Sequence, residues 1–263
     1  MQIMNVEKQM EMCRLFMRLG QPLHKAFGNL RKNHVQRSGY TWPMHAVRES
    51  AIWLWLTWHQ GGTMEQIRKT LEPIVRRSVK ANMDPKAYQS MREDHDSFLI
   101  QLAILLGNTD LMKAVCDCVQ EANPKCEEYQ YLHAWTGILK YRILGKQKKV
   151  IEQHQIMQKW KPTRIFAWPS KKLVETFVNR EYKAFHTVLK RSCEKYWRYA
   201  EKCRALTIGE DGTKTVNARR LDTHFYWPWV EGAFAKLAYL DGAQIKYDSP
   251  WLPLELVKAI EKP

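Results

Sequence analysis

The sequence predicts an all-α protein, a compact array of about nine or ten helices packed as antiparallel pairs. Apolar residues recur along most of the 263-residue chain at spacings of three and four, which place them on one side of a helix. Residues typical of helix starts and ends separate these stretches. Sustained alternation of apolar and polar residues, typical of strands, is missing. We expect one domain, residues 1–263, with a subdivision near 80–95 as the alternative.

Two helices are predicted around the pair Gly61-Gly62. The first covers residues 47–58, whose apolar positions follow the helical period. Thr63 and Gln66 have the spacing of a capping box, so the second helix is expected to begin there. Its apolar stripe consists of Ile67, Leu71, Ile74 and Val75.

Three more helices are predicted between residues 84 and 144. Asp84-Pro85 has the residue types of a helix start, and this helix is expected to run into the apolar stretch 98–106. An interruption at 92–96 is the alternative. After Gly107 a helix restarts over 111–119, and another covers 129–144.

In the second half of the chain, the sequence predicts three helices and a turn. One helix covers 150–160, and Ser170 caps a long helical stretch over 171–203. Asp211-Gly212 indicates an exposed turn or a small hairpin near 207–217. Pro228 fits the first turn of the last long helix. Tryptophans in the apolar helices are expected in the core: Trp53, Trp55, Trp58, Trp135, Trp227 and Trp229.

The positive charge is concentrated in one third of the chain. Residues 140–220 contain 21 Lys and Arg against 7 Asp and Glu, which gives +14 of the total +15. Such a field attracts polyanions or an acidic protein face, whereas the ordinary alternative is a solvated surface. The candidate binding residues lie along the predicted helix 171–203 and its end: Lys183, Lys190, Arg191, Lys195, Arg198, Lys202 and Arg204.

The sequence predicts no catalytic residue, cofactor or metal ligand. It contains no phosphate-binding loop, no zinc-protease helix and no nucleophile elbow. The six cysteines lack the spacing of a zinc site and are expected to be reduced, small buried hydrophobes. The densest acidic cluster, Asp94 to Asp96, is expected to be solvated helix surface, with an enzyme site there as the alternative.

No membrane association is expected. The longest strongly apolar run, residues 98–106, is too short to span a bilayer, and the N-terminus lacks the pattern of a secretion signal. We therefore expect a cytoplasmic protein.

Three aromatic and apolar segments carry a resemblance to a known family. They are Lys195-Tyr196-Trp197, the Ala- and Leu-rich run from Gly232 to Leu240, and the closing run from Trp251 to Val257. With these segments in this order, the C-terminal third of the chain resembles the immunity protein 49 family. The order Tyr226-Trp227, Glu231 and then Trp251 to Val257 also resembles the immunity proteins of PoNe-type DNase toxins. Residues 51–71, two helices around Gly-Gly, are similar to the N-terminal half of those proteins.

The resemblance implies an all-helical immunity protein that binds and neutralises the C-terminal domain of a cognate polymorphic toxin, of the kind delivered by type VI secretion. It implies no catalytic residues. Nuclease inhibitors are usually acidic because they mimic nucleic acid, and this chain is basic, which argues against mimicry. We expect the basic third to dock an acidic toxin surface. The alternative is a helical nucleic-acid-binding or regulatory protein that uses the same surface on phosphates.

Overall fold

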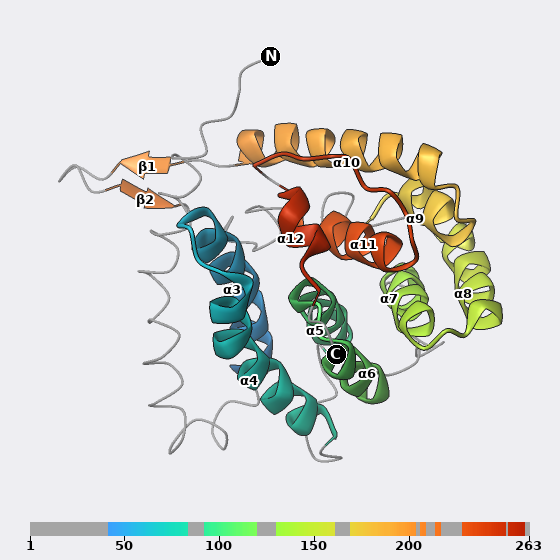
Figure 1. The fold of residues 1–263 in the computed structure, drawn as a ribbon, viewed down its shortest axis with the longest axis horizontal. Coiled ribbons are helices and arrows are strands. Elements are labelled where there is room, and N and C mark those ends of the chain that lie inside the picture. Colours follow the sequence, from blue (N-terminus) through green and yellow to red (C-terminus); the bar gives the residue numbers. More distant parts are fainter. Residues whose placement is uncertain are drawn as a thin grey trace.

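In a computed structural model of the protein, the described residues form ten α-helices and one short hairpin, so the all-α prediction is confirmed. The elements are arranged around two central helices that pack on each other, α5 (Arg92–Leu106) and α11 (Trp229–Leu240) (Figure 1). The structure describes residues 42–83, 92–119, 130–160, 169–203, 206–208, 214–216, 228–250 and 252–260.

Helices α3 (Trp42–His59) and α4 (Met64–Met83) form one side of the molecule. The predicted capping box joins them. The backbone N–H of Gln66 donates to Thr63 Oγ1 at 3.2 Å, and the N–H of Thr63 donates to Gln66 Oε1 at 3.0 Å. The predicted stripe of α4 is buried along its whole length, at Ile67, Leu71, Ile74 and Val75.

Helix α5 (Arg92–Leu106) lies at the centre, and α6 (Thr109–Cys118) follows it after a cap by Asn108. Residues 98–106 are buried on every side, because α3, α4, α6, α7 and α11 all pack around them. The alternative of an interruption at 92–96 is wrong, since the helix is continuous from Arg92. The prediction of a solvated Asp96 is also wrong. Its side chain is buried and accepts a hydrogen bond from Asn82 Nδ2 at 2.8 Å.

Helices α7 (Gln130–Ile143) and α8 (Gln147–Lys159) agree with the predicted segments to within three residues. They form the opposite side of the molecule from α3 and α4 (Figure 1). Their connection turns within three residues, where the N–H of Lys146 donates to the carbonyl of Tyr141 at 2.8 Å.

The predicted single helix over 171–203 is wrong, because the chain divides into α9 (Lys171–Val178) and α10 (Tyr182–Cys203). Arg180 adopts the left-handed region, with φ of 58°. The N–H of Arg180 donates to Phe177 O at 3.2 Å, and the N–H of Glu181 donates to Thr176 O at 2.9 Å. These bonds terminate α9 as a Schellman motif does, and α10 starts in a new direction.

The small hairpin is confirmed. Strands β1 (Leu206–Ile208) and β2 (Lys214–Val216) pair antiparallel, with Thr207 opposite Thr215. The chain then enters α11 (Trp229–Leu240), which Pro228 precedes as the N-cap residue, and ends in α12 (Leu254–Lys258).

Buried hydrophobic side chains from α3 to α12 form one cluster among the described residues. Trp55, Trp135 and Trp229 are fully buried in it, as predicted, and Trp229 stacks on Phe98 with ring centroids 5.0 Å apart. Trp53 and Trp58 are only partly buried at its edge, and Trp227 lies outside the described residues.

Candidate binding surface

The position of α10 follows from the apolar residues on its inner side. Phe185, Leu189 and Cys193 recur every four residues and are buried. Phe185 packs against Phe177 of α9, with ring centroids 6.1 Å apart. A helix with one buried side presents its remaining positions to solvent, and in α10 these positions carry the cations.

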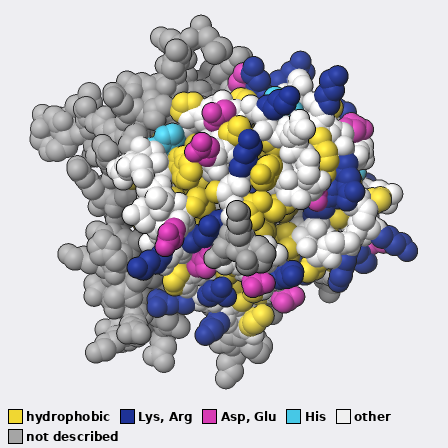
Figure 2. Space-filling model, viewed as in Figure 1, with side chains coloured by type: hydrophobic (Ala, Val, Ile, Leu, Met, Phe, Trp, Pro, Cys, Tyr) yellow, Lys and Arg dark blue, Asp and Glu magenta, His cyan; other side chains and the backbone are white. Residues whose placement is uncertain are grey.

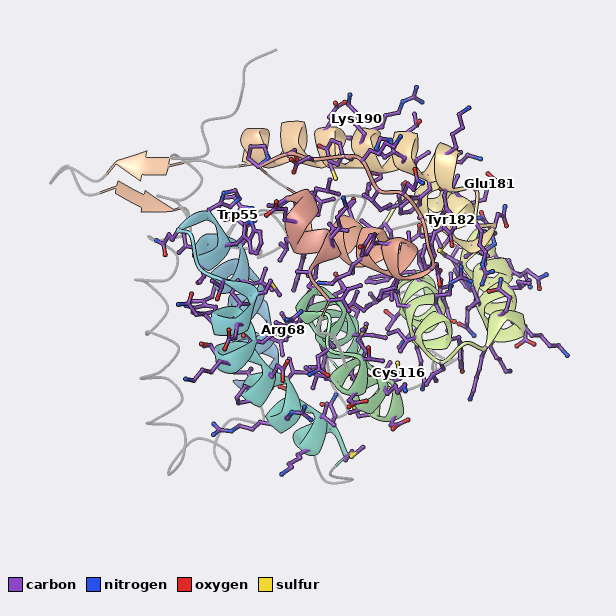
Figure 3. All side chains as sticks on the ribbon, viewed as in Figure 1. Trp55, Arg68, Cys116, Glu181, Tyr182 and Lys190 are labelled. Atoms are coloured by element: carbon purple, nitrogen blue, oxygen red, sulfur yellow. The ribbon has the colours of Figure 1, made fainter. Side chains whose placement is uncertain are left out.

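Four of the seven predicted binding residues lie exposed on α10: Lys183, Lys190, Arg191 and Lys195. Lys190 lies on the outer side of α10, away from α11 (Figure 3). Arg198 and Lys202 also belong to α10, although the structure does not describe their side chains. Arg204 lies outside the described residues.

Helices α8 and α9 extend the positive charge beyond α10. Lys and Arg side chains line the upper edge of the molecule over α10 and its right edge over α8 (Figure 2). Two of these lysines are neutralised locally, because Lys149 pairs with Glu152 at 2.9 Å and Lys172 pairs with Glu175 at 3.1 Å.

The remaining exposed cations form no ion pair with any other described residue. We call them the basic surface: Lys146, Lys148, Lys159, Arg180, Lys183, Lys190, Arg191 and Lys195. Since none of these charges is neutralised by a described neighbour, their positive field extends into solution over about the screening length in salt. Exposed Glu181, just before α10, and half-buried Glu194 on α10 interrupt it.

A buried arginine fixes the helices that carry the basic surface. Arg142, near the end of α7, donates from Nε to Asp241 Oδ2 and from Nη1 to Gln147 Oε1, each at 2.5 Å. Tyr182, the first residue of α10, donates to the same Asp241 oxygen at 3.3 Å. The guanidinium also lies 5.3 Å from the centre of the Phe177 ring. One side chain therefore joins α7, α8, α9, α10 and the end of α11.

Two of the buried cysteines, one on α10 and one on α6, have unreactive thiols. Cys193 and Cys116 are buried, and burial raises the pKa of both thiols, that of Cys116 to about 12. Such thiols stay protonated near neutral pH, which agrees with the prediction that cysteines act as small hydrophobes. Burial also raises the pKa of Glu231, on the first turn of α11, to about 7.

No cluster of three or more His, Cys, Asp or Glu residues that could hold a metal ion is found in the described part of the chain. Within the same residues, none of the helices combines the length and the apolar character that crossing a membrane requires.

Comparison with models of protein families, with curated proteins and with solved structures finds no match to this chain. The resemblance to immunity proteins therefore stays a prediction from the sequence.

Sequence reasoning missed two features of the molecular surface. Arg180 joins the basic surface through its left-handed turn, which no glycine or proline signals. Lys246 and Lys258 border a groove beside Leu240, on segments where acidic residues outnumber basic ones. The helix-ending sequence Leu240-Asp241-Gly242 is the one local signal for the groove, since it predicts that the chain turns away there and leaves the last apolar residue at the surface.

Proposed function

We propose that this chain is a cytoplasmic immunity protein, which binds the C-terminal domain of its cognate toxin and neutralises it by occlusion, without catalysis. The observation that carries the proposal is the basic surface along α8, the turn before α10 and α10 itself, a set of exposed cations that form no ion pair with any described residue. The family resemblance of the sequence supplies the class of partner.

A protein partner explains this surface better than nucleic acid does. Single-stranded nucleic acids are held by aromatic side chains that lie open among the cations. In the described part of α10, Phe185 is buried, and the Tyr182 hydroxyl is bound to Asp241 and Arg142. Carboxylates also interrupt the cations, at Glu181 and Glu194. Alternating charge of this kind matches an acidic protein face that carries a few cations of its own.

The inhibitory step follows from complementary charge. Unpaired lysines accelerate the encounter with an acidic surface, and specificity arises because a partner with the wrong charge pattern is repelled. A toxin whose catalytic carboxylates face α10 would lose access to its substrate when the complex forms. Because the Arg142 contacts hold α8, α9 and α10 together, the surface meets the toxin already ordered, which reduces the entropic cost of binding.

Co-expression in bacteria tests this proposal. The toxin domain encoded beside this chain should arrest growth, and the wild-type chain should restore growth and co-purify with the toxin. A basic-surface variant should protect poorly although it folds; its changes are Lys183→Glu, Lys190→Glu and Arg191→Glu.

The matched control reverses three exposed charges on α4, which does not pack against α10. This α4 variant should protect like the wild type; its changes are Lys69→Glu, Arg77→Glu and Lys80→Glu. Growth arrest that the wild type does not relieve would contradict the proposal. Submicromolar affinity of the wild type for arbitrary duplex DNA at physiological salt would support the phosphate-binding alternative instead.

A further inference from the structure

A shallow groove of about 640 Å³ lies where α11 ends, between its last turn and the segment that leaves α12. Tyr239, Leu240 and Ile260 supply its apolar lining, and Lys246 and Lys258 supply its charge. Hydrophobic side chains gather over α11 and α12 in the centre of the face whose upper edge carries the α10 lysines (Figure 2).

The end of α11 explains why the groove is open. The N–H of Gly242 donates to Tyr239 O at 3.0 Å, and the N–H of Ala243 donates to Ala238 O at 2.9 Å. Gly242 takes φ of 92°, a left-handed conformation that suits glycine. The chain turns at this point and buries Ala243 and Ile245, so that Leu240 stays at the surface with 39% of its area exposed.

Leu240 is unusual within the described part of the chain. Three large hydrophobic side chains there are exposed, and the other two, Met83 on α4 and Ile151 on α8, do not border the groove. An exposed leucine in a concave site rimmed by polar groups is typical of an anchor pocket in a protein interface.

The charges of the groove select the occupant. Lys246 and Lys258 are exposed and form no ion pair with a described residue, although Glu255 lies one turn before Lys258. The nearest carboxylate at the end of α11, that of Asp241, is held by Arg142 at 2.5 Å. Among the described residues that line the groove there is no carboxylate.

Hydrogen bonds from two side chains hold the wall of the groove that residues 258–260 form. Arg68 Nη2 donates to Ala259 O at 3.2 Å, and Lys236 Nζ donates to Leu256 O at 3.2 Å. Both side chains also donate to the end of α5, at Leu106 O and Leu105 O. The groove is therefore preformed, and filling it needs no rearrangement of α12.

We infer that this groove is the anchor site of the interface and that it takes a segment of the toxin domain in which an apolar side chain lies next to carboxylates. The apolar side chain would cover Leu240 and Tyr239, and the carboxylates would pair with Lys246 and Lys258. The inference rests on the proposed function and adds to it the point where the partner is held, whereas the basic surface governs encounter.

Selection from a phage-displayed library of random twelve-residue peptides on the full chain tests the groove without the toxin. Selected peptides should combine Leu, Ile or Phe with Asp or Glu. A fluorescein-labelled peptide of the consensus sequence should lose about tenfold or more in affinity for Leu240→Asp and for Lys246→Glu with Lys258→Glu, as measured by anisotropy. The matched control, Lys69→Glu with Lys80→Glu on α4, should bind like the wild type.

Circular dichroism melting should show that each variant folds, because the substituted side chains are exposed. Selected peptides that lack acidic residues, a selection that yields no consensus, or equal affinity for the wild type and Leu240→Asp would overturn the inference. The co-expression assay separates the two proposals. Full protection by Leu240→Asp would remove the groove from the interface and leave the immunity function standing. If the wild type binds the consensus peptide but gives no protection, the groove stands as a peptide-binding site and the immunity function is contradicted.

Discussion

Arg68 of α4 and Lys236 of α11 donate to neighbouring carbonyl oxygens at the end of α5, those of Leu106 and Leu105, at 2.8 and 2.7 Å. Each also donates to the C-terminal segment, so these two side chains join α5 to α12. The positive charge of the Arg68 guanidinium is favourable at the carboxyl end of α5, where carbonyls lack partners. Burial lowers the pKa of Lys236 well below its ordinary value, and the nearby Arg68 lowers it further.

Removing Arg68 should therefore destabilise the fold. Arg68→Ala leaves the Leu106 and Ala259 carbonyls without this donor, and hydrogen bonds to charged groups contribute about 1.5–3 kcal/mol each at most. We expect a loss of about 2 kcal/mol in the free energy of unfolding, measured with urea. Arg76→Ala is the control on the same helix, because Arg76 is exposed and its pair with Glu72 spans 3.9 Å. Equal losses for both variants would contradict the joining role of Arg68.

Glu231 should make stability depend on pH. Burial raises its pKa in the folded protein to about 7, above the ordinary value of 4.5, so the folded state holds the proton more tightly than the unfolded chain does. The free energy of unfolding should fall as pH rises from about 4.5 to about 7, by roughly 3 kcal/mol from this group, and stay level above.

Urea unfolding of the wild type and Glu231→Gln across this range isolates the effect. Burial lowers the pKa values of His59 and His154, so these two groups act in the opposite direction, and they do so equally in both proteins. The thiol of Cys193, whose raised pKa reflects burial and the nearby Glu231, stays protonated throughout. If the wild type and the variant show the same pH slope, Glu231 does not titrate in this window.

Trp55 should contribute more to stability than its neighbour Trp53. Trp55 is fully buried and donates from Nε1 to Pro250 O at 3.3 Å, which ties α3 to the segment before α12. Trp55→Ala should cost about 3–5 kcal/mol, as other large truncations in cores do. Trp53 lies partly exposed at the edge of the same helix, and Trp53→Ala should cost distinctly less in the same thermal and urea measurements. The reverse order would show that α3 packs with its other side inward.

Arg142 should hold α10 in place through its planar guanidinium rather than its charge alone. Arg142→Lys keeps the charge but cannot reach Asp241, Gln147 and Tyr182 together, so we expect a loss of about 2 kcal/mol in unfolding free energy. Hydrogen exchange should also increase in the first turns of α10. Lys140→Arg on the same helix is a control substitution of the same size. Unchanged exchange in α10 for Arg142→Lys would contradict this role.

Much of the fold could be predicted because its signals are local. The capping box of Thr63 and Gln66, the buried stripe of α4 and the hairpin near Asp211-Gly212 each depend on residues close in sequence. The division between α9 and α10 could not be predicted, since no glycine or proline marks it and Arg180 adopts the left-handed region that glycine usually takes at a helix end.

The candidate site was predictable only where it lies on one helix. The exposed side of α10 follows from its period, and four predicted residues lie there. The groove could not be predicted, because Leu240, Lys246 and Lys258 meet only after α11, the segment after it and α12 have packed. The burial of Lys236 could not be predicted either. Its partners are the backbone carbonyls of Leu105 and Leu256, and a sequence does not reveal which carbonyls lie near a lysine.

The most direct test of the account is the rate at which the purified chain associates with its toxin domain. Surface plasmon resonance at low and at physiological salt would compare the wild type with the basic-surface variant and the α4 variant. The account predicts that the basic-surface variant associates about tenfold or more slowly at low salt, that the difference shrinks as salt rises, and that the α4 variant matches the wild type. Equal association rates for the wild type and the basic-surface variant at low salt would contradict it.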